Sequence, residues 1–84
     1  MNSKQRGTLA AVFATPTHKD VEWPVVESPF KAAGCAVVEG DGSRVRFVFA
    51  QHVATSHRPH PATEAKAYQV EQAREFLMLI GATP

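Results

Sequence analysis

The sequence predicts an α+β fold in which three β-strands lie between two helices, in the order α–β–β–β–α. Apolar residues recur at helical spacing on both sides of a central region, and within that region they alternate with polar residues. The segment Gly40-Asp41-Gly42 has the composition of a hairpin turn. Three strands joined by short turns form an antiparallel sheet, and both helices are expected on one face of it.

Composition indicates one small domain. The chain has 84 residues, of which 44% are hydrophobic, and this fraction is ordinary for a globular protein. No apolar run is long enough to cross a membrane, and the polar residues 1–7 do not resemble a secretory signal. A single cysteine, Cys35, has no cysteine partner for a disulfide or a zinc site. We therefore expect a cytoplasmic protein that does not bind a membrane.

The first segment is expected to form a short helical arm. Ser3 is a candidate N-cap, and Thr15-Pro16 ends the pattern. One side of this helix carries Leu9, Val12 and Phe13. We expect residues 1–20 to be an arm laid on a domain formed by residues 21–84.

The first helix of the domain contains a proline whose effect the sequence does not decide. Trp23, Val26, Phe30 and Ala33 fall on one helical face that stops at Gly34. Pro24 suits the first turn, whereas Pro29 would remove an interior hydrogen bond at a cost of about 3 kcal/mol. Either one helix is kinked, or Ser28 caps a shorter helix that begins at Pro29.

The central region predicts three strands. Residues 36–39 form the first, and in the second Val45, Phe47 and Phe49 alternate with Arg44, Arg46 and Val48. The aromatic residues are expected to face the helices and the two arginines the opposite side. A third strand covers residues 53–58, after the connection Gln51-His52, and Pro59 and Pro61 end it.

The last segment returns to helical spacing. Val70, Ala73, Leu77 and Ile80 form a stripe with Phe76 beside it, and Gly81 terminates the helix. The aromatic residues at positions 23, 30, 47, 49 and 76 are predicted to lie in the core. Base stacking on exposed aromatic rings is therefore not predicted.

Positive charge is concentrated in one part of a nearly neutral chain. The net charge is +1, yet from Arg44 to His60 there are three arginines, three histidines and no acidic residue. Such a distribution predicts a cationic face that attracts phosphates or an acidic protein partner. The alternative is an exposed strand whose charges serve only solubility.

The residue types in this region suit metal-independent RNA cleavage. Such cleavage needs a base for the 2′-hydroxyl proton, an acid for the leaving oxygen and a cation for the charge on phosphorus oxygens. His57 and His60 suit the proton roles, and Arg44, Arg46 and Arg58 suit phosphate binding. Ser43 either donates to a phosphate or only shapes the turn.

The spacing leaves the geometry of the two histidines open. In a straight strand His57 and His60 would lie about 10 Å apart on opposite faces, unless Pro59 bends the chain. Two imidazoles are too few ligands for a zinc site, so no metal or cofactor is predicted.

The order of elements, the Gly42-Ser43 turn, the proline-bounded basic segment His57–Pro61 and the helix that ends at Gly81 resemble the HicA-type toxins over residues 21–82. These are small endoribonucleases of bacterial toxin–antitoxin pairs with a fold like the double-stranded RNA-binding domain. The resemblance implies a type II toxin that cleaves mRNA, a single-stranded RNA, without a metal. It also implies a HicB-like antitoxin that covers the basic sheet face with acidic groups opposite Arg44, Arg46 and Arg58.

The sequence departs from that family at the residue regarded as catalytic. The family has a histidine on the second strand after the Gly-Ser turn, whereas here Arg44 and Val45 follow, and the next histidine is His52. The catalytic role cannot be assigned by position. Two hypotheses follow: an endoribonuclease that uses His57 and His60, or a non-catalytic module of the same fold that binds RNA or the antitoxin.

Overall fold

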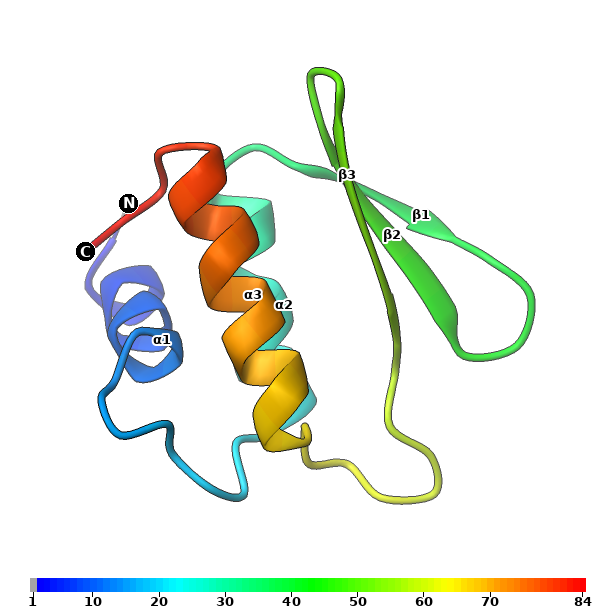
Figure 1. The fold of residues 1–84 in the computed structure, drawn as a ribbon, viewed down its shortest axis with the longest axis horizontal. Coiled ribbons are helices and arrows are strands. Elements are labelled where there is room, and N and C mark those ends of the chain that lie inside the picture. The colour runs from blue at the N-terminus through cyan, green and yellow to red at the C-terminus, as the bar shows by residue number, and fades with distance from the viewer. Residues whose placement is uncertain (1) are drawn as a thin grey trace.

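The computed structural model describes residues 2–84, which form three helices and one three-stranded sheet (Figure 1). The predicted order α–β–β–β–α is confirmed, with one further helix at the N-terminus. The elements are α1 (Ser3–Val12), α2 (Trp23–Ala32), β1 (Ala36–Glu39), β2 (Arg44–Phe49), β3 (His52–His57) and α3 (Ala67–Leu79). The helices lie to one side of the sheet, and the other face of the sheet is uncovered.

The sheet is antiparallel, with β2 in the centre between β1 and β3. Alternation along β2 points Val45 and Phe47 toward the helices, where both are almost fully buried. Arg44 and Arg46 are exposed on the opposite face, as predicted. We call this uncovered side of the sheet the outer face.

Two tight turns connect the strands. In the first, the Gly40 N–H donates to the Arg44 carbonyl oxygen at 2.9 Å, and Gly42 has a φ of 61°, which favours glycine. The second turn needs only Ala50 and Gln51, with Ala50 at a φ of 54°. Because this turn is so short, His52 begins β3 instead of lying in the connection, and the strand ends one residue earlier than expected.

A single helix, α2, contains both of its prolines. Pro24 lies in the first turn and Pro29 inside the helix. The shorter helix that would begin at Pro29 is therefore wrong. Pro29 is buried, as are Val26 and Phe30 on the same helix, and this burial offsets the lost backbone hydrogen bond. Gly34, with a φ of 93°, follows the end of the helix.

The N-terminal helix α1 begins with a capping box centred on Asn2, so the expectation that Ser3 is the N-cap is wrong. The Asn2 side-chain oxygen accepts from the Gln5 N–H at 2.8 Å, and the Gln5 side-chain oxygen accepts from the Asn2 N–H at 2.9 Å. Ser3 lacks this geometry because it is already the first helical residue.

The N-terminal arm packs on the domain. Leu9 and Val12 are buried in the same core as the apolar residues of α2 and α3. From α3, Arg74 donates to the carbonyl oxygens of Val12 and Ala14, both at 3.0 Å. These hydrogen bonds satisfy carbonyl groups at the end of α1 that have no partner within the helix.

The core contains three aromatic rings in contact, of which two are stacked and the third is tilted. The ring centroids of Phe30 and Phe47 are 4.0 Å apart at an interplanar angle of 11°, and Phe76 packs on Phe30 at 5.8 Å. Phe47 joins the sheet to α2, and Phe76 joins α2 to α3. Trp23 is also buried and Phe49 partly so, as predicted.

Within residues 2–84, no helix has the length and apolar character needed to cross a bilayer.

Phe47→Ala is expected to destabilise the fold by about 3–5 kcal/mol, because it removes the ring that joins the sheet to α2 and leaves a cavity. Val53→Ala is the matched control on the same sheet, since Val53 is 54% exposed, and it should change stability by no more than about 0.5 kcal/mol. Urea unfolding measures both. Equal effects of the two substitutions would contradict this description of the core.

Candidate functional site

The two segments singled out in the sequence lie side by side. The antiparallel register places Arg44 opposite His57. Beyond that pair, the Arg58 N–H donates to the Ser43 carbonyl oxygen at 2.8 Å. The Ser43 hydroxyl oxygen is 3.5 Å from Nδ1 of His57, which is a long hydrogen bond. The Gly42-Ser43 turn and the end of β3 thus form one edge of the molecule.

A shallow depression of about 280 Å³ lies between this edge and the start of α3. We call it the histidine depression. Its lining residues are Ser43, His57, Arg58, Pro59, His60, Ala62, Glu64, Lys66, Tyr68 and Gln69. His57 and His60 therefore border one hollow, because the chain turns after β3. Of the predicted site residues, only Arg44 and Arg46 lie outside it, on the outer face.

Arg58 does not share the outer face with Arg44 and Arg46, which corrects the expected cationic face. It follows the outward-pointing His57, so its side chain turns toward the helices. There its Nε donates to Oε1 of Glu27 at 2.6 Å, and its Nη1 donates to Oε1 of Glu39. These two carboxylates raise the pKa of Arg58, which stays protonated, and their negative charges offset its positive charge.

Glu27 is a buried carboxylate on α2 that holds this arrangement together. Its Oε1 accepts from Trp23 Nε1 at 2.5 Å as well as from Arg58, and Lys31 lies 3.7 Å from Oε2. Burial favours a raised pKa for Glu27, but the hydrogen bonds from Arg58 and Trp23 and the nearby positive charges outweigh it. The pKa of Glu27 is therefore lowered and the group is ionised.

Gln69 ties the end of β3 to the start of α3. This buried side chain donates from Nε2 to the His57 carbonyl oxygen at 2.8 Å. Its Oε1 accepts from the Lys66 N–H at 3.0 Å. The His57 backbone is thereby fixed from the helix side, while the imidazole remains exposed.

Four polar lining residues lie outside the set of predicted site residues: Glu64, Lys66, Tyr68 and Gln69. All follow Pro61, and only the return of the chain from β3 to α3 places them beside the histidines. Their polar character was visible in the sequence, but no local spacing related them to residues 57–60.

Glu64 brings a carboxyl group to the depression. A hydrogen bond with Asp20 and the negative charge of that residue raise the pKa of Glu64 above its ordinary value. Backbone pairing of residues 22 and 64 brings the two segments together. A carboxylate here repels phosphate when ionised, so the positive charge of Lys66 is partly offset.

The outer face is divided into a cationic and an apolar half. Arg44 and Arg46 lie toward the Ser43 end with His57, and Val48 lies toward the other. On β3, Val53 lies opposite Val48 and is 54% exposed, whereas on β1 Val38, which is 42% exposed, lies opposite Arg46. No acidic residue occupies the outward-facing positions of the three strands. The predicted basic sheet face is thus also apolar.

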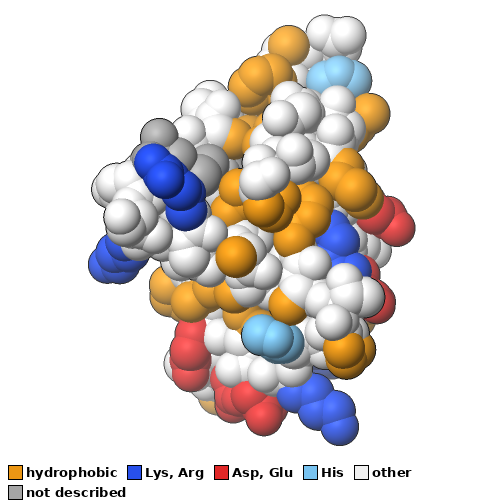
Figure 2. All heavy atoms as spheres, turned by 90° about the vertical axis from the view of Figure 1, so that its left-hand side faces the viewer, with side chains coloured by type: hydrophobic (Ala, Val, Ile, Leu, Met, Phe, Trp, Pro, Cys, Tyr) orange, Lys and Arg blue, Asp and Glu red, His pale blue; other side chains and the backbone are white. Residues whose placement is uncertain are grey.

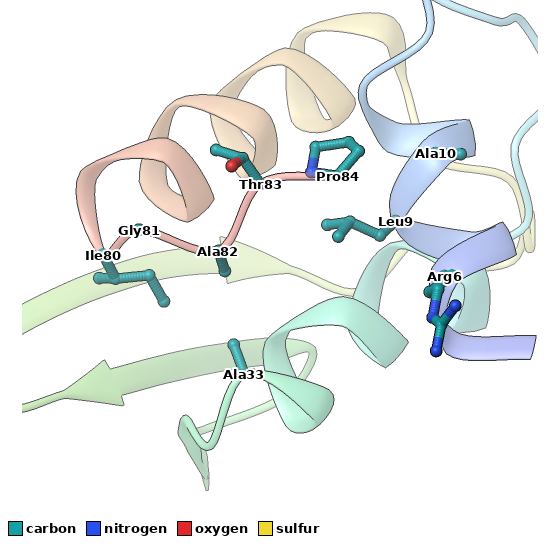
Figure 3. A pocket seen from close by; sticks show the side chains of 9 residues that line it. All are labelled: Arg6, Leu9, Ala10, Ala33, Ile80, Gly81, Ala82, Thr83 and Pro84. Atoms are coloured by element: carbon teal, nitrogen blue, oxygen red, sulfur yellow. The ribbon is translucent and has the colours of Figure 1, made fainter. Parts of the chain in front are cut away.

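A larger hollow, of about 690 Å³, lies at the chain ends, among α1, the end of α2 and the C-terminal tail (Figure 3). Its lining is mainly aliphatic, and Arg6 is the one ionisable side chain in it. The face with both chain ends shows broad apolar patches and charged side chains mostly at its margins (Figure 2). Among residues 2–84, this hollow has no pair of side chains suited to proton transfer.

The other histidines lie apart from the depression, His18 in the segment after α1 and His52 at the start of β3. Across residues 2–84, no three side chains among His, Cys, Asp and Glu come close enough to hold a metal ion. Cys35 is buried, and burial raises the pKa of its thiol.

Comparisons with models of protein families, with curated proteins and with solved structures found no match.

Glu27→Gln is expected to lower stability at neutral pH by about 2 kcal/mol, because it removes the charge that pairs with Arg58. The pKa of Glu27 is lowered in the fold, so its contribution is present above its ordinary value of 4.5 and is lost as the pH falls through the lowered pKa. The difference between wild type and variant should shrink in acid. Urea unfolding at several pH values measures it.

Lys31→Gln is the matched control, because Lys31 also pairs with Glu27 but is largely exposed. It should cost no more than about 1 kcal/mol. A Glu27→Gln deficit that stays constant from neutral pH to acid would contradict the ionised state of Glu27.

Proposed function

We propose that the protein is a metal-independent endoribonuclease that cleaves single-stranded RNA, including mRNA, and acts as the toxin of a HicA-like type II toxin–antitoxin pair in the cytoplasm. The observation that carries this proposal is the histidine depression, in which His57 and His60 border one hollow beside Lys66 and Ser43. The resemblance of the Gly42-Ser43 turn and the His57–Pro61 segment to that family supports it.

The chemistry requires two proton transfers. One imidazole removes the proton of the 2′-hydroxyl, and the 2′-oxygen then attacks phosphorus. The other imidazole gives a proton to the leaving 5′-oxygen as its bond to phosphorus breaks. The products are a 2′,3′-cyclic phosphate and a 5′-hydroxyl. We assign one of these proton transfers to His57, as base or acid, because Gln69 holds its carbonyl oxygen. The other proton transfer is assigned to His60.

The charge role falls to residues other than Arg58. Because Arg58 already forms ion pairs with Glu27 and Glu39, we propose that its role is to position the His57–His60 segment. Lys66 lines the depression, and Arg44 lies opposite His57 on the next strand. These two cations, with Arg46 and the Ser43 hydroxyl, are proposed to bind the RNA backbone and the developing charge.

A HicB-like antitoxin is the proposed protein partner, and the outer face is its proposed docking surface. The exposed valines of the outer face would bury apolar area against the antitoxin, and Arg44 and Arg46 would pair with its acidic groups.

The second candidate function is a non-catalytic module that binds RNA or this antitoxin. The absence of a histidine directly after Gly42-Ser43 and the presence of Glu64 in the depression favour it.

Incubation of the protein with single-stranded RNA in excess chelator tests the proposal. We expect cleavage that leaves cyclic phosphate ends, and His57→Ala should slow it by about 10²- to 10⁴-fold. His60→Ala should slow it as well. RNA methylated at the 2′-oxygen should resist cleavage, since it has lost the attacking group.

His18→Ala is the matched control, because His18 is exposed and lies outside the depression. It should cleave RNA at the wild-type rate. Binding without cleavage would favour the non-catalytic module. A wild-type protein that neither binds nor cleaves RNA would contradict both the nuclease and an RNA-binding module.

A further inference from the structure

Tyr68 differs from every other aromatic residue that the structure describes. It is 54% exposed, whereas Trp23, Phe30, Phe47 and Phe76 are buried, and Phe13 and Phe49 are partly buried. Tyr68 is the second residue of α3, and it lines the histidine depression beside His57, His60 and Lys66. An aromatic ring is thus exposed at the site proposed for RNA chemistry.

No packing or hydrogen-bonding role within residues 2–84 accounts for this ring. Tyr68 is not part of the hydrophobic core, and its hydroxyl makes no hydrogen bond in the described part of the chain. The buried residues of the same helical turn, Gln69 and Val70, anchor α3 without it. The ring is therefore available to a ligand.

The charge of the depression favours a contact that does not depend on phosphate. Arg58 is occupied by Glu27 and Glu39, and Glu64 adds a carboxyl group. Lys66 is the one lining cation that makes no ion pair in the described chain. Within the depression, charge offers phosphate only Lys66, so a contact to a base would add affinity to that from Arg44 and Arg46 on the outer face.

We propose that Tyr68 is a stacking platform for an unpaired nucleobase next to the phosphate that occupies the histidine depression. This inference rests on the proposed function and specifies its substrate as single-stranded RNA with at least one unstacked base at the site. Stacking on an aromatic ring accepts every base, so it gives affinity with little sequence preference. A base in a duplex is already stacked and paired, and thus it is not available to Tyr68.

Binding of a short, fluorescently labelled, single-stranded 2′-O-methyl RNA tests this, because methylation separates binding from cleavage. Tyr68→Leu keeps an apolar side chain but removes the ring, and it should raise the dissociation constant by roughly 5- to 150-fold. Tyr68→Phe keeps the ring and should bind as the wild type does. Leu79→Ala, at the far end of α3 and 62% exposed, is the matched control and should have no effect.

A second arm uses only the wild-type protein and Tyr68→Phe, so it does not depend on how other variants fold. Replacement of the bases by abasic sites should weaken binding by a similar factor. The inference is overturned if Tyr68→Leu, with native circular dichroism, binds the RNA as tightly as the wild type, or if the abasic strand binds equally well. In those cases the proposed nuclease can still stand. If the wild type binds no RNA at all, the proposed function fails and the inference with it.

Discussion

Arg58, held between Glu27 and Glu39, is the interaction on which the geometry of the candidate site depends. Arg58 directly follows β3, and its side chain joins this end of the strand to Glu27 on α2 and to Glu39 on β1, the far edge strand of the sheet. The Arg58 backbone also pairs with Ser43. Because the backbone and the side chain of Arg58 are both held, the position of the segment that follows is fixed, and His60 borders the same depression as His57.

This arrangement assigns different tasks to neighbouring residues of one basic segment. Arg58 points inward and stabilises the fold, whereas His57 points outward and stays exposed. Gln69 of α3 also lies on the helix side of the sheet, and it holds the His57 carbonyl. An exposed imidazole on a fixed backbone suits proton transfer, since its position is set while its ring remains accessible to a substrate.

Much of the fold could be predicted from the sequence because its elements depend on local patterns. The alternation from Arg44 to Phe49 and the apolar stripe of α3 each specify a buried face. The N-cap at Asn2 also has a local signal, because Gln5 three residues later gives the spacing of a capping box. The uninterrupted α2 could not be predicted in the same way, because it depends on the burial of Pro29 against other elements.

The candidate site was predictable only in part, for a related reason. His57, His60 and Ser43 were found because the chemistry of their side chains is distinctive. The orientation of Arg58 depends on Glu27, which is thirty-one residues away and has no local signal. Lys66 and Tyr68 lie beside the depression because the irregular segment 58–66 returns the chain from β3 to α3. No periodic pattern in the sequence predicts the path of such a segment.

The account requires that RNA binds at the histidine depression and not at the larger apolar hollow beside the chain ends. Titration of the isotope-labelled protein with a single-stranded 2′-O-methyl RNA, followed by amide chemical shifts, locates the bound strand directly. The account predicts shifts concentrated at Ser43, Arg44 and residues 57–68. Shifts concentrated at Leu9, Ala33 and residues 80–84, with the depression unchanged, would contradict it.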